Sequence, residues 1–271
     1  MPELAEVEFY RLKWDAGVGA KIARVELHAG RRLLRGVDEK ALSTKLAGAK
    51  LIGSQAHGKQ MAFQFSGGAW LGIHLGMTGE LRIASADFVP AKHDHLVLFQ
   101  RERALVFTDP RMFGRVLFFA GKGEPDWWRE LPPQILSREF TLSFVSERLQ
   151  RHRSLPLKAA LLDQATFPGI GNWMADEILW QARIHPRTKA GALTTAQLKD
   201  LWRVTRYVTK RAVETVAQQS SKAEFGDPPK NFLFHARWRK GGNCPRCGGA
   251  LRHDTIGGRT TASCPKCQTS P

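Results

Sequence analysis

The sequence predicts an α+β fold, with an antiparallel β sandwich first, a helical domain second and a small cysteine-rich ribbon last. Three observations support this prediction. Short runs rich in Val, Ile, Leu and Phe fill most of residues 20–120. From residue 141 onward the apolar positions recur at spacings of three and four, which is the helical period. All four cysteines lie within the last 28 of the 271 residues.

The first domain is expected over residues 1–125. Its opening stretch, PELAEVE, combines a proline with three acidic residues and predicts the start of a helix, where the helix dipole favours negative charge. Seven runs enriched in β-branched and aromatic residues follow, separated by Gly, Asp and charged residues. The expected strands are residues 21–28, 50–57, 60–66, 69–76, 95–100, 104–109 and 115–120.

A linker is expected over residues 126–140, because Pro132 and Pro133 interrupt this stretch, and its two tryptophans, Trp127 and Trp128, are expected to be exposed. The helical domain is expected over residues 141–225, and the ribbon domain over residues 226–271, after the pattern stops at FGDPPKN. The expected helices are residues 141–152, 156–165, 172–183 and 194–216.

The charge of the chain indicates a polyanionic partner. There are 41 Lys and Arg against 25 Asp and Glu, which gives a net charge of +16 and a pI near 10.2. Such a field attracts nucleic acid, although the same charge also serves solubility alone. No apolar stretch approaches the roughly 18 residues of a membrane helix, and the acidic N-terminus does not resemble a signal peptide. We therefore expect a cytoplasmic protein with no membrane partner.

The cysteine cluster predicts a metal site. Its pattern is C-x2-C, sixteen intervening residues, then C-x2-C, from Cys244 and Cys247 to Cys264 and Cys267. Four thiolates at this spacing suit one structural Zn²⁺ ion. A tail this short cannot bury enough apolar surface to fold alone, so the metal would supply much of its folding free energy. The alternative, two redox CxxC pairs, lacks a neighbouring thioredoxin-like βαβ pattern.

Two glycine-containing turns indicate phosphate binding. In TFPGIGN, residues 166–172, a proline and two glycines end one helix, and Asn172 stands where the N-cap of the next would be. Backbone N–H groups at such a turn bind phosphate, but an ordinary helical hairpin has the same pattern. Between the cysteine pairs, a Gly-Gly turn at 257–258 presents Arg259, either to a phosphate or simply to solvent.

Seven motifs, taken in order, resemble one family. They are PELAEVE at the N-terminus, HGK at 57–59, HLGMTG at 74–79, KHDH at 92–95, TDPRMFG at 108–114, GIGN at 169–172 and the terminal cysteine ribbon with its arginine. Their order and spacing are similar to those of bacterial formamidopyrimidine-DNA glycosylases. The resemblance implies a β sandwich with an N-terminal helix, a helix–two-turn–helix domain and a zinc ribbon. It also implies a DNA repair enzyme that excises oxidised bases and cleaves abasic sites.

The resemblance assigns the catalytic residues. The family loses Met1 and uses the secondary amine of the N-terminal proline, here Pro2, as the nucleophile that forms a Schiff base before β and δ elimination. Without the other motifs, the same stretch would be an ordinary helix start. In the family, Glu3 is the general acid or base, and Glu6 is the second acid. Lys59 matches the lysine at the phosphate next to the lesion, and Arg259 matches the ribbon arginine.

The resemblance also implies the DNA contacts. His74, His93, Arg153 and Asn172 match positions that contact or position the DNA backbone. Met77, Arg111 and Phe113 match the side chains that fill the gap left by an extruded base, which an apolar wedge, a guanidinium and an aromatic ring suit. Two alternatives remain: core packing for Met77 and Phe113, and a metal site at the H-x-H pair formed by His93 and His95.

The segment 217–237 departs from the family, because it is shorter than the region whose loop closes over an extruded 8-oxoguanine. The expected substrates are therefore formamidopyrimidine, 8-oxoguanine or oxidised pyrimidine lesions, and abasic sites, in double-stranded DNA. We expect a monomer in a bacterial cytoplasm, associated with the nucleoid. A noncatalytic protein that binds lesions or bent DNA on the same scaffold is the main alternative. A general zinc-ribbon protein of transcription or translation leaves residues 1–120 unexplained.

Overall fold

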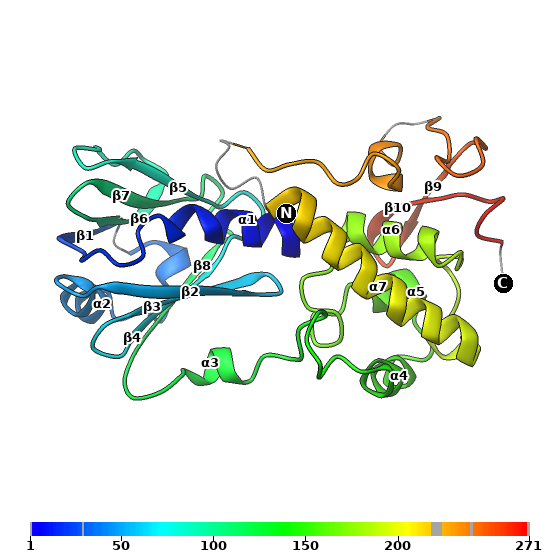
Figure 1. The fold of residues 1–271 in the computed structure, drawn as a ribbon, viewed down its shortest axis with the longest axis horizontal. Coiled ribbons are helices and arrows are strands. Elements are labelled where there is room, and N and C mark those ends of the chain that lie inside the picture. Colours follow the sequence, from blue (N-terminus) through cyan, green and yellow to red (C-terminus); the bar gives the residue numbers. More distant parts are fainter. Residues whose placement is uncertain (1, 29, 218–223, 239–240, 270–271) are drawn as a thin grey trace. The chain divides into compact units, whose positions relative to one another are not determined.

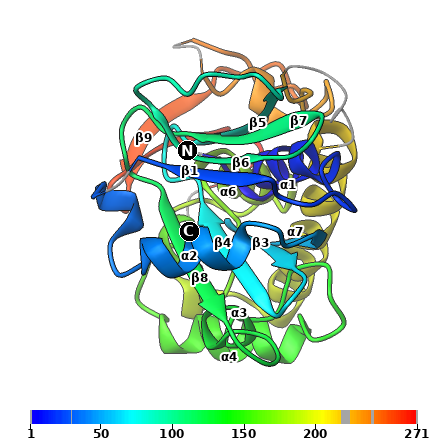
Figure 2. The same ribbon diagram turned by 90° about the vertical axis from the view of Figure 1, so that its left-hand side faces the viewer.

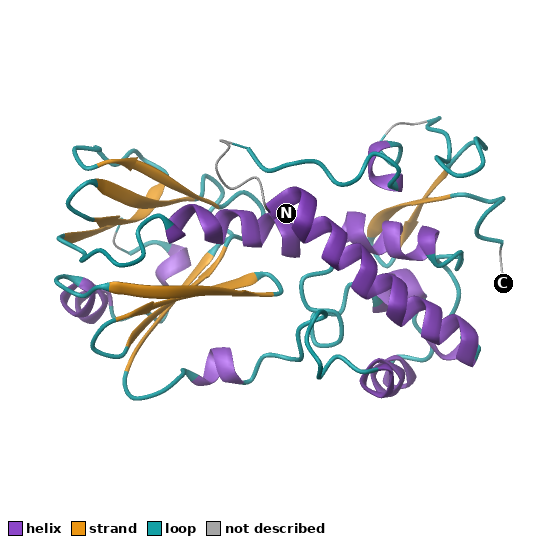
Figure 3. Cartoon of the chain, in the orientation of Figure 1, coloured by secondary structure: helices purple, strands orange, loops and turns teal. Residues whose placement is uncertain are grey.

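The structure is a computed structural model that describes residues 2–28, 30–217, 224–238 and 241–269 (Figure 1). The chain divides into two compact units. The first comprises Met1–Pro2, Glu6–Leu131 and Gln219–Phe225. The second comprises Glu3–Ala5, Pro132–Gln218 and Gly226–Pro271. Strands dominate the first unit and helices the second, so the predicted α+β class is confirmed (Figure 3).

The first unit contains two four-stranded antiparallel sheets, with strand orders β1-β6-β7-β5 and β2-β3-β4-β8. Figure 2 shows the two sheets as separate layers, which confirms the predicted sandwich. Seven strands overlap the seven predicted runs. The bounds are β1 Arg24–Leu27, β2 Leu51–His57, β3 Gln60–Phe65, β4 Ala69–His74, β5 Glu80–Ser85, β6 Asp94–Phe99, β7 Arg103–Thr108 and β8 Arg115–Ala120.

The main core of the first unit lies between the sheets and includes Trp14 of helix α1 (Leu4–Asp15). Strand β6 is buried on both faces. Because successive side chains of a strand point to opposite faces, Leu96 and Leu98 enter the main core. Val97 and Phe99 join a second cluster on the other face. This double coverage explains why residues 96–99 of β6 form a continuous apolar run rather than an alternating one.

The expectation that Trp127 and Trp128 are exposed is wrong. Trp128 is buried in a small cluster with Ala62 of β3 and Trp70 of β4, and Trp127 packs against the same cluster. The helix α3 (Asp126–Arg129) carries both indoles onto the sheet. Gly72 of β4 gives them room, since a Cβ there would approach the Trp127 ring to 2.9 Å. The prolines that follow therefore mark the end of a packed segment.

The second unit is built from helices that share one core. Its helices are α4 Leu142–Arg151, α5 Leu157–Ala160, α6 Asn172–Gln181 and α7 Thr195–Val216. Thr141 caps α4, and a capping box formed by Thr194 and Gln197 starts α7. The helix predicted over 156–165 is a single turn that ends at Ala160, and beyond it Asp163 forms a turn by accepting hydrogen bonds from Ala165 N and Thr166 Oγ1.

The ribbon is a two-stranded antiparallel hairpin, β9 Arg252–Ile256 and β10 Arg259–Ser263. Gly257 and Gly258 form its turn with φ values of 60° and 73°, which confirms the predicted Gly-Gly turn. Strand β5, helix α2 (Glu39–Leu46) and the short 3-10 helices η1 (Arg32–Leu34), η2 (Ala190–Ala192) and η4 (Leu233–His235) were not predicted. Among the described residues, no helix has the length and apolar character that a membrane crossing requires.

Candidate functional site

Glu3 binds the first turn of α6 through its carboxylate. Oε1 accepts a hydrogen bond from Trp173 N at 2.9 Å. Oε2 accepts from Gly171 N at 2.9 Å and from Met174 N at 3.1 Å. The side chain is only 3% exposed, and its charge lies where the helix dipole and the unpaired N–H groups stabilise an anion. Glu3 is thus the cap of a helix that begins 169 residues later.

The prediction that Asn172 is the N-cap of this helix is wrong. Gly171 occupies the cap position in an extended conformation, and Asn172 is the first helical residue. A glycine is required at 171, because a Cβ there would lie 2.3 Å from Cδ of Glu3. Glu3, which is distant in the sequence, therefore caps the helix in place of the local Asn172.

Pro2 directly precedes Glu3 and is half-buried. The backbone N–H of Leu4, the first residue of α1, donates to Gly169 O at 3.0 Å, so the chain directly after Glu3 is also held. Glu6 lies on α1, one turn before Tyr10. Burial first, and then the negative charges of Glu80 and Glu6, raise the pKa of Tyr10 to about 12. Met1 lies outside the described residues.

Lys59 and His74 lie at neighbouring positions of one sheet. Lys59 lies in the turn between β2 and β3, and His74 ends β4 opposite Gln60. The Nδ1 atom of His74 accepts from Gly76 N at 3.0 Å, so a neutral ring carries its proton on Nε2. Burial, and then the charge of Lys59, lower the pKa of His74. Lys59 therefore supplies a cation, and His74 supplies a neutral Nε2–H donor.

Met77, Arg111 and Phe113 lie on two adjacent turns. Gly76 packs so closely against the other turn that a Cβ there would lie 2.4 Å from the Phe113 carbonyl carbon. Met77 and Phe113 are each 43% exposed, which excludes core packing for both. The Arg111 guanidinium carbon lies 4.8 Å from the Phe113 ring centroid. An apolar side chain, an aromatic ring and a cation are thus presented together to solvent.

Asp109 holds these two turns in place. Its fully buried carboxylate accepts from Thr78 Oγ1 at 2.8 Å and from Gly114 N at 2.7 Å. Arg111 N donates to the same carboxylate at 3.3 Å. The turn that follows includes Met112, which has a positive φ of 53°. The Asp109 carboxylate therefore holds both of the turns that carry Met77, Arg111 and Phe113.

His93 is half-buried and lies beside the same turn, because Asp109 N donates to its carbonyl oxygen at 3.0 Å. The Nε2 atom of His95 instead lies 2.9 Å from Asp109 O, and the ring is buried. Within the described residues, the only group of three or more possible metal ligands in close proximity is the cysteine cluster. His95 therefore has a structural partner rather than a metal.

In the second unit, Asn172 lies against the ribbon strand that carries Arg259. The Nδ2 atom of Asn172 donates to Thr260 Oγ1 at 3.1 Å, and Arg259 is the exposed neighbour of Thr260 in β10. The hairpin turn packs on α5, since a Cβ on Gly257 would lie 2.8 Å from Cβ of Ala159. Arg153, also exposed, lies in the turn after α4.

A buried ion cluster behind Asn172 was not predicted. Asp176 of α6 accepts from Lys158 Nζ at 2.5 Å and from Arg237 at 2.7 Å. It also accepts from Ala262 N of β10 at 3.0 Å. Lys158 donates in addition to Asn172 O at 2.7 Å, and burial is the largest cause that lowers its pKa. The charged residues at 158 and 176, in helices whose other residues are mostly apolar, are the sequence signal that would have revealed it.

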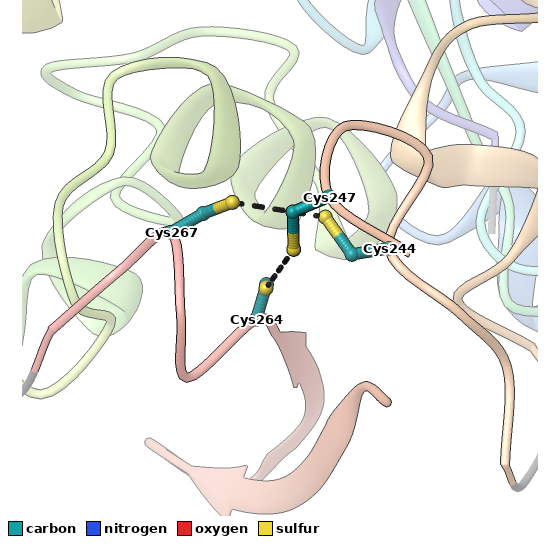
Figure 4. A group of neighbouring side chains, drawn as sticks. All are labelled: Cys244, Cys247, Cys264 and Cys267. Atoms are coloured by element: carbon teal, nitrogen blue, oxygen red, sulfur yellow. Dashed lines mark hydrogen bonds between the residues drawn. The ribbon is translucent and has the colours of Figure 1, made fainter. Parts of the chain in front are cut away.

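The four cysteine sulfurs converge (Figure 4). All four lie within 4.8 Å of one another, with 3.9 Å between Cys244 and Cys267 and 3.5 Å between Cys247 and Cys264. Tetrahedral Zn²⁺ with bonds of about 2.3 Å separates its sulfurs by roughly 3.8 Å, so these residues fit the ion. Although burial opposes it, hydrogen bonds from the Trp180 indole and from backbone N–H groups lower the pKa of Cys244 to about 6, which favours a thiolate.

Comparison with protein families gives three matches along the chain. Residues 1–116 match the formamidopyrimidine-DNA glycosylase N-terminal domain, and residues 131–224 match the formamidopyrimidine-DNA glycosylase H2TH domain. Residues 229–270 match a transposase zinc-ribbon domain. The three matches together account for most of the chain.

Relatives and solved structures agree with these matches. The formamidopyrimidine-DNA glycosylase of Roseiflexus sp. (strain RS-1) is 35% identical over 273 residues, which cover 99% of this chain and 100% of the relative. That of Thermus thermophilus is 36% identical over 280 residues, covering 99% and 98%. A structure of MutM with DNA containing carbocyclic 8-oxo-G has a TM-score of 0.87 at 28% identity, covering 99% and 100%. The Lactococcus lactis Fpg complex with FAPY-dG containing DNA gives 0.86 at 27% identity, with the same coverage.

Proposed function

Because this chain belongs to the formamidopyrimidine-DNA glycosylase family, we propose that it is a bifunctional enzyme that removes an oxidised base from double-stranded DNA and then cuts the strand at the abasic site. The glycosylase class follows from the family. Formamidopyrimidine and 8-oxoguanine lesions are the proposed substrates, since relatives of similar fold have been solved with such DNA.

The proposed nucleophile is the secondary amine of Pro2, exposed once Met1 has been removed. It attacks C1′ of the damaged nucleotide, and the base leaves with the electron pair of its bond to C1′ and takes up a proton. The proline nitrogen then loses its proton, and its electron pair forms an iminium with C1′ as the C1′–O4′ bond breaks and O4′ takes up a proton. Loss of the acidified C2′ proton expels the 3′ phosphate, loss of the C4′ proton expels the 5′ phosphate, and water hydrolyses the iminium and releases the proline.

The observation that carries this proposal is the set of three backbone hydrogen bonds to Glu3, described above. They orient a carboxylate immediately beside the proline, with no reorganisation needed when positive charge develops on the iminium. In the proposal, Glu3 stabilises that iminium and relays protons at O4′ and C2′. Glu6, one turn along α1, is the second acid.

Phosphate contacts are proposed for two groups of residues. Lys59 and His74 supply a cation and a neutral Nε2–H donor from one sheet, and Lys59 assists elimination as a charge partner of the phosphate. From α6, Asn172 supplies an amide N–H donor, and from the ribbon, Arg259 supplies a second cation. Arg259 also assists the second elimination. His93 and Arg153 extend these contacts along the DNA backbone.

The exposed triad on the 74–79 and 108–114 turns is proposed to fill the space of the extruded base. Extrusion costs a few kcal/mol of stacking and pairing, so an inserted side chain lowers its cost. Met77 is the apolar wedge, Phe113 stacks on a neighbouring base, and Arg111 reads the unpaired partner base through its donors.

One Zn²⁺ ion held by the four cysteines is proposed to be structural, so it takes no part in the reaction. A monomer in the cytoplasm, associated with the nucleoid, is the proposed working state, and residues 1–125, 141–225 and 226–271 are its proposed domains. Within the segment 217–237, residues 218–223 lie outside the described residues, and whether it forms a lesion-capping loop is left open.

The test is covalent trapping. Untagged protein is incubated with DNA that contains an abasic site, sodium borohydride is added, and the adduct is digested and mapped by mass spectrometry. We expect a stable adduct whose DNA remnant is on the nitrogen of Pro2, in protein that has lost Met1. Product analysis without borohydride should show both β- and δ-elimination ends.

Two results would contradict the proposal. A remnant mapped to a lysine such as Lys59 would show that Pro2 is not the nucleophile. Absence of any adduct and of base release from a panel of oxidised lesions, with tight binding of the same duplexes, would favour a noncatalytic lesion-binding protein.

A further inference from the structure

Trp238 is the most exposed aromatic residue among the described ones, at 61%, and the proposed reaction gives it no role. Burial of so large an apolar ring against a partner would be favourable, because it removes a large apolar area from water. Tryptophan is enriched at binding hot spots, because its large rigid surface is buried at a small cost in conformational entropy. The question is which partner it meets.

The indole is held by buried groups and does not project freely. The guanidinium carbon of Arg237 lies 4.1 Å from the centroid of the Trp238 ring, and Arg237 is only 4% exposed. Phe234 packs edge-on against the same indole at 5.7 Å and against the buried Trp173 at 5.1 Å. Because Arg237 covers one face of the indole, the large exposed area belongs to its opposite face and its edges.

The Arg237 side chain connects Trp238 to the proposed phosphate contacts of the second unit. Its guanidinium donates to Asp176 at 2.7 Å, and Asp176 lies one helical turn after Asn172. The same carboxylate accepts from Ala262 N in β10, the strand that begins with Arg259. One ion pair therefore separates the stacked indole from the elements that carry Asn172 and Arg259.

The surroundings of Trp238 in the sequence are strongly basic. The only acidic residue between 236 and 269 is Asp254, whereas Lys or Arg occupies positions 237, 239, 240, 246, 252, 259 and 266. Aromatic rings among cations are the usual means of binding nucleic acid strands, because bases and sugars stack on the ring while the cations meet the phosphates. This charge favours DNA over a protein partner.

We infer that the open face of Trp238 packs against a base or deoxyribose of the DNA strand whose phosphates meet Asn172 and Arg259. The inference rests on the proposed function. Stacking on a base adds affinity that does not depend on counterion release, so it complements the phosphate contacts. Trp238 is thereby a further DNA-binding residue of the second unit.

The experiment compares wild type with Trp238→Ala and Trp238→Phe. Binding to a duplex with a tetrahydrofuran abasic analogue is measured by fluorescence anisotropy at several salt concentrations. We expect Trp238→Ala to weaken binding about tenfold with an unchanged salt dependence, as loss of one stacked base does. The Phe variant keeps a stacking face, and we expect it to stay within about threefold of wild type. Tyr207→Ala, which removes a 46% exposed ring of α7, is the matched control and should bind like wild type.

A spectroscopic readout does not depend on stability. In protein labelled with 5-fluorotryptophan, the ¹⁹F resonance that is missing from Trp238→Phe belongs to residue 238, and we expect it to shift on addition of the duplex. Wild-type affinity of Trp238→Ala, with that resonance unmoved, would overturn the inference and assign the ring to another partner. Equal weakening of the Ala and Phe variants with lowered thermal stability would overturn it in favour of a structural role. Failure of wild type to bind the duplex would instead overturn the proposed function as well.

Discussion

Glu3 combines two tasks at the scale of a single residue. It caps α6 through three backbone hydrogen bonds, and it stands beside the proposed nucleophile. Capping explains its burial, and burial in turn orients the carboxylate. A carboxylate held in this way is suited to stabilise a cation that appears only during the reaction.

Glu3→Gln removes the negative charge at position 3 but keeps nearly the same side-chain shape, so it tests what the charge contributes. Glu3→Gln keeps one acceptor oxygen but directs an NH₂ group at backbone N–H donors. We expect base excision to slow about 100-fold or more, because a positioned acid or base contributes this much. We also expect the free energy of unfolding to fall by about 1–2 kcal/mol, as for loss of a helix cap.

Single-turnover excision of a formamidopyrimidine lesion and urea unfolding measure these two effects. Glu8→Gln is the matched control, because it removes a carboxylate of α1 that pairs with Arg11. It should leave the excision rate within about threefold, since the proposed reaction gives Glu8 no role. Excision by Glu3→Gln at the wild-type rate would show that the negative charge is not required.

The pKa of His74 should respond to its neighbour. Burial and the charge of Lys59 lower it from the ordinary value of 6.5. We expect Lys59→Gln to raise this pKa, while burial still keeps it below the ordinary value. NMR titration of the ring Cε1–H measures the change, and Lys92→Gln, an exposed lysine elsewhere, should leave it unchanged.

The sign of the linked stability effect follows from this shift. Because the folded-state pKa of His74 is lower than that of the unfolded chain, its contribution to stability is present above pH 6.5 and is lost as the pH falls through the folded value. Lys59→Gln should lose less stability on acidification over this window. A larger loss than in wild type would contradict the assignment of Lys59 as a cause of the shift.

At the scale of elements, Asp176 joins α5, α6, β10 and the segment that carries Arg237. We expect Asp176→Asn to lower the free energy of unfolding by about 3–5 kcal/mol, because two buried cations lose their common anion. Asp200→Asn, which breaks an exposed pair with Arg203, should cost no more than about 0.5 kcal/mol. Chemical denaturation compares the two, and a similar small loss for both would show that the buried cluster does not stabilise the fold.

The element pattern also shows which parts of the fold were predictable. Strands with continuous or alternating apolar residues were predicted correctly, because a buried strand has a recognisable pattern of apolar residues in the sequence. Strand β5, ELRIAS, was missed because its only core residue is Leu81 and the rest is half-buried or exposed. Helix α2 was missed although Asp38 caps it and Leu42 and Leu46 share its buried face.

The site was less predictable from local pattern than the fold. A resemblance to a family suggested Pro2 and Glu3 as candidate catalytic residues, but the hydrogen bonds of Glu3 join positions about 170 residues apart. The spacing of apolar residues cannot predict such a contact, because neither Glu3 nor the start of α6 changes the apolar pattern of its own segment. The misplaced N-cap has the same origin: Asn172 has the right side chain, and the carboxylate that caps the helix is far away in the sequence.

At the scale of the whole molecule, the net charge of +16 should make DNA binding strongly salt-dependent. Each phosphate contact adds about 0.9 to the slope of log affinity against log salt concentration. We expect Arg259→Gln to reduce that slope by about 1 and to weaken binding alike for different sequences. Anisotropy titrations between low and moderate salt measure the slope, and an unchanged slope would show that Arg259 does not meet a phosphate.

The close approach of Gly171 to Glu3 also constrains how this protein can be redesigned. A methyl group at 171 has no room while a glutamate occupies position 3, since it would lie 2.3 Å from the carboxyl carbon. Position 171 therefore accepts a larger residue only together with a shorter side chain, such as aspartate, at position 3. Any library that varies the middle of the chain while preserving its beginning should exclude this glycine from randomisation.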